Sequence, residues 1–294
     1  MVYVLTLVAA LIVAVGEVIQ QRWAAQAPPE YNLSPKLLLW LVRRPRWLGG
    51  VGCSFGGNVV FAAALSTGSV ILVEAVFVVR LIFVLIIAAV WNRHPVPLRE
   101  MLGGLAITGG LVAFLLAAQP SESAAQNVPA LRWAVGGGAA VAIAAVLAVV
   151  AARSGPNRKA TLLGTGAGTL YGLQASLTQS AVLILSGAGA LALLTTWNGY
   201  AVATVALLGM LLIQSAFEAA PIEASYPAVV TAQLVGAIVI GVTVLGGEVR
   251  LDPASLAVLL AALLLMILGV FLVARSPLVT GQATRYQKPE ESTR

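Results

Sequence analysis

Residues Ser69–Trp91 read "SVILVEAVFVVRLIFVLIIAAVW", an apolar run that carries two charged side chains, Glu74 and Arg80. A charge near the centre of a membrane-spanning helix costs about 2.5–3.5 kcal/mol on insertion scales. Such side chains therefore face the interior of a helix bundle, usually along the path of a solute or an ion. The run predicts a membrane helix, and its two charges predict a transport protein.

The composition extends this interpretation to almost the whole chain. Of its 294 residues, 60% are hydrophobic and only 10% are charged, whereas soluble domains carry about 25% charged residues. A net charge of +6 could attract nucleic acid, but the basic residues are spread over short loops. We therefore expect the lipid bilayer, and no nucleic acid, as the partner of this surface.

Nine apolar segments are each long enough to cross about 30 Å of hydrocarbon at about 1.5 Å per residue. The sequence thus predicts an all-α fold, a polytopic membrane helix bundle of about nine transmembrane helices. The predicted spans are residues 2–23, 47–65, 68–91, 99–118, 131–152, 160–185, 197–217, 222–246 and 254–274.

The basic residues indicate the orientation. Of the 17 Lys and Arg residues, all but Arg80, Arg132 and Arg250 would lie on one side of the membrane. Cytoplasmic loops carry the excess of Lys and Arg, so this side is predicted to be the cytoplasm. We expect a multi-pass protein of the cell (plasma) membrane with its N-terminus outside and its C-terminus inside.

The two halves of the chain share a pattern at an offset of about 153 residues, which aligns the segment from Phe61 with the segment from Gln214. Residues 1–275 are predicted to form one transporter domain, with repeat one at 1–118, a linking helix at 131–152 and repeat two at 160–275. One linking helix inverts the second half, which gives a 4+1+4 inverted repeat, as in secondary transporters. The polar tail 276–294 is predicted to be disordered.

Four stretches carry a resemblance to a known family: "RPRWLGGVGCSFGGNVVFAAALSTGSVILVEAVF", "REMLGGLAITGGLVAFLLAAQPSE", "GTGAGTLYGLQASLTQSAV" and "SYPAVVTAQLVGAIVIGVTVLGGEV". They resemble the drug/metabolite transporter (DMT) superfamily, in an actinobacterial-type branch related to NIPA-type magnesium transporters. Pro227 and the Gly247-Glu248 turn match its pattern. The resemblance implies export of a small metabolite or amphipathic solute, or transport of magnesium. The acid that the NIPA-type pattern places before the Asn matched by Asn58 is missing, which argues against magnesium.

Polar side chains inside the predicted spans are the candidates for a substrate or ion pathway. Tyr171, Gln174 and Thr178 recur at i, i+3 and i+7, so they share one helix face. Glu74 and Arg80 are about 600° apart around a helix, so we expect their partners on other helices. Gln233 is equivalent to Arg80 in the repeat. The predicted pathway residues are Glu17, Gln20, Asn58, Glu74, Arg80, Tyr171, Gln174, Thr178, Asn198, Tyr226 and Gln233.

No motif for catalysis or metal binding is present, since the chain lacks paired Cys, HExxH and Walker sequences. We expect no enzyme, no cofactor and no metal site. The leading hypothesis is an ion-coupled secondary transporter, an exporter of a small-molecule or ion substrate. Two alternatives stay open: a magnesium or divalent-cation transporter, and a non-transporting scaffold subunit of an envelope complex. A homodimer is also open.

The orientation can be tested with a cysteine placed beside Arg158, in a background without the native Cys53. A membrane-impermeant thiol reagent should label this cysteine only after the membrane is permeabilised. Labelling from the outside of intact cells would contradict the predicted topology.

Overall fold

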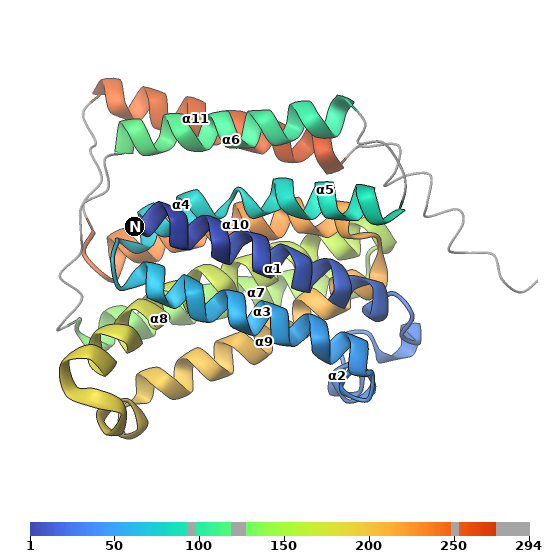
Figure 1. The fold of residues 1–294 in the computed structure, drawn as a ribbon, viewed down its shortest axis with the longest axis horizontal. Helices are drawn as coiled ribbons and strands as arrows, with labels where there is room; N and C mark the ends of the chain where they lie inside the picture. The colour runs from blue at the N-terminus through green and yellow to red at the C-terminus, as the bar shows by residue number, and fades with distance from the viewer. Residues whose placement is uncertain (93–97, 119–127, 248–252, 275–294) are drawn as a thin grey trace, which may run out of the picture.

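The computed structural model describes residues 1–92, 98–118, 128–247 and 253–274, and within these ranges the chain is built from helices and their connections (Figure 1). The elements are α1 (Val2–Ala24), the 3-10 helix η1 (Pro29–Tyr31), α2 (Pro35–Val42), α3 (Pro45–Leu65), α4 (Val70–Phe77), α5 (Arg80–Asn92), α6 (Leu98–Ala118), α7 (Ala130–Ala152), α8 (Pro156–Thr195), α9 (Trp197–Ala219), α10 (Ile222–Thr243) and α11 (Pro253–Ala274). The prediction of an all-α protein is confirmed for the described residues.

Seven of the described helical segments are long and apolar enough to cross a membrane, with α4 and α5 taken together as the segment Val70–Trp91. In α6 and α11 the described apolar stretches are shorter, Met101–Phe114 and Ser255–Gly269. The chain is therefore a helical, membrane-embedded protein by length and composition. The total of nine spans and the inverted repeat stay predictions, and the predicted disordered tail lies outside the described residues.

The span predicted at 68–91 is not one regular helix, because α4 ends at Phe77 and α5 begins at Arg80. The intervening turn is tightened by i→i+3 hydrogen bonds, from Val79 N to Val76 O at 3.2 Å and from Leu81 N to Val78 O at 3.0 Å. Such 3-10 geometry often marks a functional position inside a helix. Hydrophobicity could not reveal the turn, since the residues that form it are as apolar as their neighbours.

The span predicted at 160–185 is longer in the structure. Helix α8 runs from Pro156 to Thr195 and is interrupted at Gly189, where φ is 84°. Glycine adopts this left-handed conformation without the steric cost of a Cβ atom. Residues 186–195 lie outside the predicted span, yet they are helical on either side of this break.

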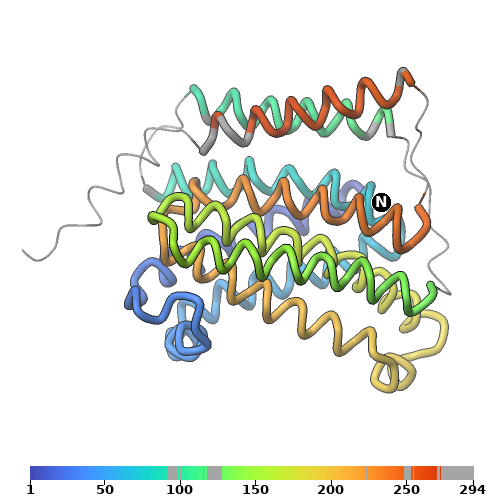
Figure 2. The backbone as a smooth tube through the Cα atoms, turned by 180° about the vertical axis from the view of Figure 1, so that it is seen from behind, coloured from blue at the N-terminus to red at the C-terminus, as the bar shows by residue number. Residues whose placement is uncertain are grey.

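Close helix pairs form the centre of the molecule, where α8 packs along both α9 and α10, and α1 packs along α3. Helices α6 and α11 pair with each other in a separate layer at one edge (Figures 1 and 2). Glycines at four-residue intervals bring α8 against α10. A Cβ atom would lie 2.7 Å from Ser225 O at Gly164, 2.2 Å from Val229 O at Gly168, and 2.6 Å from Ala237 N at Gly172. Small residues at this spacing allow such close contact between membrane helices.

This packing predicts that Gly172→Ala destabilises the protein, because the added methyl group meets backbone atoms of α10 that cannot move aside alone. Overpacking of this kind costs about 1–3 kcal/mol. The midpoint of thermal unfolding in detergent should fall. Gly138→Ala is the matched control, since nothing lies within 4 Å of its Cβ position, and equal midpoints for both variants would contradict the close packing.

Candidate functional site

A cavity of about 480 Å³ lies between α1, α3, α8 and α9, with contributions from α4, α5 and α10. Its walls bring together polar residues that are up to 216 positions apart in the chain, from Glu17 to Gln233. All but two of the predicted pathway residues line it: Glu17, Gln20, Asn58, Glu74, Arg80, Tyr171, Gln174, Thr178 and Gln233. It is therefore the candidate site for a solute.

The other two predicted residues lie outside the cavity lining. Asn198, at the start of α9, donates a hydrogen bond to Ser180 Oγ at 3.0 Å and thus ties α9 to α8. Tyr226 is fully buried, and the guanidinium of Arg80 lies 5.7 Å from the centroid of its ring. Asn198 thus has a packing role, while Tyr226 supports a residue of the cavity.

Gln233 connects Glu74 and Arg80, which are both almost fully buried. Its Nε2 atom donates to the two carboxylate oxygens of Glu74, at 2.7 and 3.0 Å. A terminal nitrogen of Arg80 donates to Gln233 Oε1. As the helical spacing of Glu74 and Arg80 indicated, their partner comes from a different helix, α10. The Glu74–Gln233–Arg80 chain keeps two opposite charges together in an apolar interior, where an unpaired charge would be costly.

Aromatic rings fix the orientation of the Arg80 side chain. The guanidinium carbon of Arg80 lies 4.4 Å from the centroid of the Phe77 ring, a distance at which a cation is attracted to the face of an aromatic ring. Phe77 ends α4 and Arg80 begins α5, so the turn between these helices places the ring and the cation next to each other. The same turn directs Arg80 toward α10.

Glu17 contrasts with Glu74, because its buried Oε2 atom has no hydrogen-bond partner. Gln174 on α8 likewise has a buried Oε1 atom without a partner. Arg80 interacts electrostatically with Glu17 as well as with Glu74. Two hydrogen-bond acceptors are thus unoccupied at the wall of the cavity, one on α1 and one on α8.

Gln20 lines the cavity one turn after Glu17, but its amide is fully used. Gln20 Nε2 donates to Ser54 Oγ at 2.7 Å, and Gln20 Oε1 accepts from Gln214 Nε2 at 2.7 Å. Trp47 Nε1 extends the network to Gln214 Oε1 at 3.2 Å. Ser54 and Trp47 were not among the predicted residues. Ser54 is a polar residue inside a predicted span, and this polarity could have indicated it. Trp47 lies at the start of α3, where tryptophan is also typical of the membrane interface, so its residue type did not indicate a site.

The cavity has apolar walls beside its polar groups and reaches the molecular surface. Phe55 and Val59 on α3 line it although they are 71% and 56% exposed. Ala203 and Ala206 of α9 also line it, and Ala203 is exposed. The opening therefore lies between α3 and α9.

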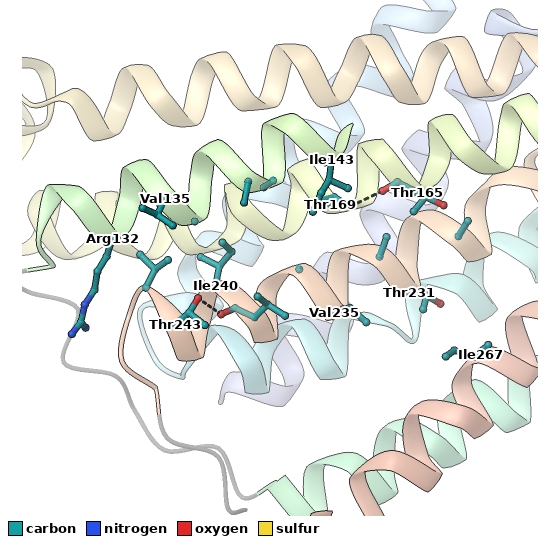
Figure 3. A pocket seen from close by; sticks show the side chains of 18 of the residues that line it. Arg132, Val135, Ile143, Thr165, Thr169, Thr231, Val235, Ile240, Thr243 and Ile267 are labelled. Carbon is teal, nitrogen blue, oxygen red and sulfur yellow. Dashed lines mark hydrogen bonds between the residues drawn. The ribbon is translucent and has the colours of Figure 1, made fainter. Parts of the chain in front are cut away.

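A second cavity, of about 920 Å³, lies between α7, α8 and α10 (Figure 3). Several of its threonine hydroxyls donate to carbonyls of their own helices, such as Thr169 to Thr165 O at 2.9 Å and Thr243 to Val239 O at 2.6 Å. Apart from Arg132 at one end, its lining carries no charged side chain. This groove therefore offers few groups that could orient a polar solute.

Cation ligands are sparse in the described part of the chain, where no group of three or more His, Cys, Asp or Glu side chains could hold a metal ion. Two carboxylates, Glu17 and Glu74, line the central cavity. Hard divalent cations take six or more oxygen ligands, or a near-ideal octahedral set. The donor set of the cavity is poor for such an ion.

The chain is 27% identical, over 270 residues, to a protein of Corynebacterium glutamicum whose name says only that it is uncharacterised. The alignment covers 92% of this chain and 93% of that protein. No family model and no solved structure matches the chain. The function must therefore be argued from the geometry of the cavity.

The geometry predicts that Gln233→Met destabilises the protein, because the buried Glu74 and Arg80 then lose the amide that joins them. Leaving a buried polar group without its partner costs about 1–3 kcal/mol, and more for a charged group. The midpoint of thermal unfolding in detergent should fall clearly. Gln26→Met is the control, since Gln26 is exposed and its side chain donates to the nearby Arg22 O, and an equal midpoint for both variants would contradict the bridging role.

Proposed function

We propose that the protein is a secondary membrane transporter that moves a small metabolite or amphipathic solute by alternating access, in the direction of export. The observation that carries the proposal is the central cavity, where Glu17, Glu74 and Arg80 meet in a membrane-embedded bundle. Ionisable residues at membrane depth usually mark the path of a solute or ion. The chain carries no ATP-binding motif, so an ion gradient is the proposed energy source.

The proposed inverted repeat draws support from one contact. Arg80 and Gln233 are 153 residues apart and hydrogen-bond to each other, and this separation equals the offset at which the two halves align. Equivalent residues of an inverted repeat face each other near its pseudo-two-fold axis, and substrate sites lie at the same interface. The nine-span topology, the DMT-like family assignment and the plasma-membrane location belong to the same proposal.

The cavity weighs against the two alternative functions. A scaffold subunit needs no cavity and would gain nothing from charged groups that line one. A divalent-cation pathway needs several oxygen ligands at one depth. Both oxygens of Glu74 already accept hydrogen bonds from Gln233, which in turn binds Arg80. Glu17 alone is too small a donor set for a hard divalent cation.

Glu17 is the proposed coupling group, because both oxygens of Glu74 already accept hydrogen bonds from Gln233. The other ionisable groups in the lining are Arg80 and Tyr171, both close enough for an electrostatic interaction with Glu17. A carboxyl group without a fixed partner can exchange a proton for a solute as the cavity opens to either side. Glu74 would then serve chiefly to hold Arg80 in place.

Proteoliposomes with a panel of radiolabelled solutes test the proposal, with and without a pH gradient. Wild-type protein should accumulate at least one solute in response to the gradient. In Glu17→Gln the response to pH should vanish while solute exchange at equal pH persists, because the side chain keeps its size but no longer titrates. Glu30→Gln, at an exposed acid in η1, should behave like the wild type.

The outcomes separate the parts of this proposal. Accumulation that survives in Glu17→Gln but is lost in Glu74→Gln would move the coupling role to Glu74. Wild-type protein that accumulates nothing from a panel of cations, anions and neutral solutes would contradict transport itself.

A further inference from the structure

The charges that line the central cavity do not balance. Glu17, Glu74 and Arg80 are its charged residues, and Arg80 is joined to Glu74 through the amide of Gln233. With both acids ionised, the cavity carries one negative charge more than its positive charge, and this excess belongs to Glu17. A buried charge without a counter-charge is strongly unfavourable, so a proton or a cation must accompany it.

Two buried hydrogen-bond acceptors in the cavity lining lack a partner. Glu17 Oε2 and Gln174 Oε1 are buried and have no partner in the structure. Buried acceptors of this kind are nearly always paired in proteins, and an orphaned one needs an explanation. A ligand with N–H donors can donate to such atoms, whereas a ligand with acceptors alone can donate to neither.

One donor in the cavity also lacks a partner, the Nε atom of Arg80. The guanidinium of Arg80 is already engaged, because it donates to Gln233 and lies over the ring of Phe77. An anion at Arg80 would also have to approach the carboxylate of Glu74, which the same amide holds. Of the buried lining atoms without a partner, two are thus acceptors and one is a donor.

The rest of the lining favours an organic ligand over a bare metal ion. Phe61, Met210 and Phe217 line the cavity together with the ring of Tyr171. A volume of about 480 Å³ falls within the range of about 300–1,000 Å³ typical of small-molecule sites. Aromatic faces also attract cations that have lost their water. A ligand with an apolar body and one positive charge fits both the aromatic residues and the acidic Glu17 of this lining.

We propose that Glu17 and Gln174 form a binding site for a monovalent organic ammonium ion, an amine with an apolar body. The carboxylate of Glu17 neutralises the ammonium and accepts one N–H hydrogen bond, and Gln174 Oε1 accepts a second. The apolar body lies against the aromatic walls and enters through the opening between α3 and α9. The inference deepens the proposed function by naming its substrate class, but binding can be measured without any flux.

Three probes of similar shape test the charge requirement on the purified protein in detergent. They are 2-phenylethylammonium, the neutral 2-phenylethanol and the anionic 3-phenylpropionate, with Kd measured by titration calorimetry. The ammonium ion should bind at least about tenfold more tightly than either of the others, a ratio that corresponds to about 1.4 kcal/mol. Equal affinity for the alcohol, or preference for the carboxylate, would overturn the site and favour Arg80 as an anion anchor.

Variants test which residues provide the acceptors. Glu17→Gln should weaken binding of 2-phenylethylammonium at least about tenfold, and Gln174→Leu should weaken it by a smaller factor. Glu30→Gln keeps the same change of charge at an exposed site and should leave the Kd unchanged. Unaltered binding in Glu17→Gln would overturn the proposal, and if that variant does not fold, Gln174→Leu and the three probes still decide it.

The failure of this site and the failure of transport give different results. Ammonium binding that depends on Glu17, without accumulation of any solute in proteoliposomes, would leave the site standing and refute transport. Accumulation of an anionic or neutral solute, without ammonium binding, would refute the site and leave transport standing.

Discussion

The hydrogen-bonded amide of Gln233 is the contact on which the centre of the molecule depends. It donates to both oxygens of Glu74 and accepts from Arg80, so that three helical segments, α4, α5 and α10, are joined through one side chain. In a low-dielectric interior, both charges would be far more costly apart than together. The break between α4 and α5 and the close approach of α8 to α10 both serve to bring these groups into reach.

The two carboxylates of the cavity differ because their neighbours differ. Both oxygens of Glu74 accept hydrogen bonds from Gln233, and Arg80 lies close enough to offset its charge. Glu17 on α1 has an oxygen without a partner, as does the amide of Gln174 in the same cavity lining. In the structure Glu74 thus joins helices through Gln233, whereas Glu17 keeps an oxygen without a partner.

Much of this arrangement could be predicted from the sequence, because the cost of burying charge is large and local. The sequence indicated that Glu74 and Arg80 face inward and that they do not share a helix face. It also indicated that Tyr171, Gln174 and Thr178 lie on one face of their helix. Two features could not be predicted in this way. The turn at Val78 and Val79 lies among residues of uniform hydrophobicity, and the partner of Gln20 depends on how α9 packs. Both are set by contacts between distant segments, which periodicity along one segment does not encode.

The break at Gly189 has a consequence for the length of α8. A straight helix of 40 residues would extend about 60 Å, about twice the thickness of the hydrocarbon layer. The straight part before Gly189, residues 156–188, extends about 50 Å, and the chain turns back into α9 at Trp197 shortly after the break. The Trp197 ring meets Trp133 of α7 edge to face, with ring centroids 5.7 Å apart, and such aromatic residues favour the boundary between lipid and water. One glycine thus sets where the chain reverses between two long helices that pack along each other.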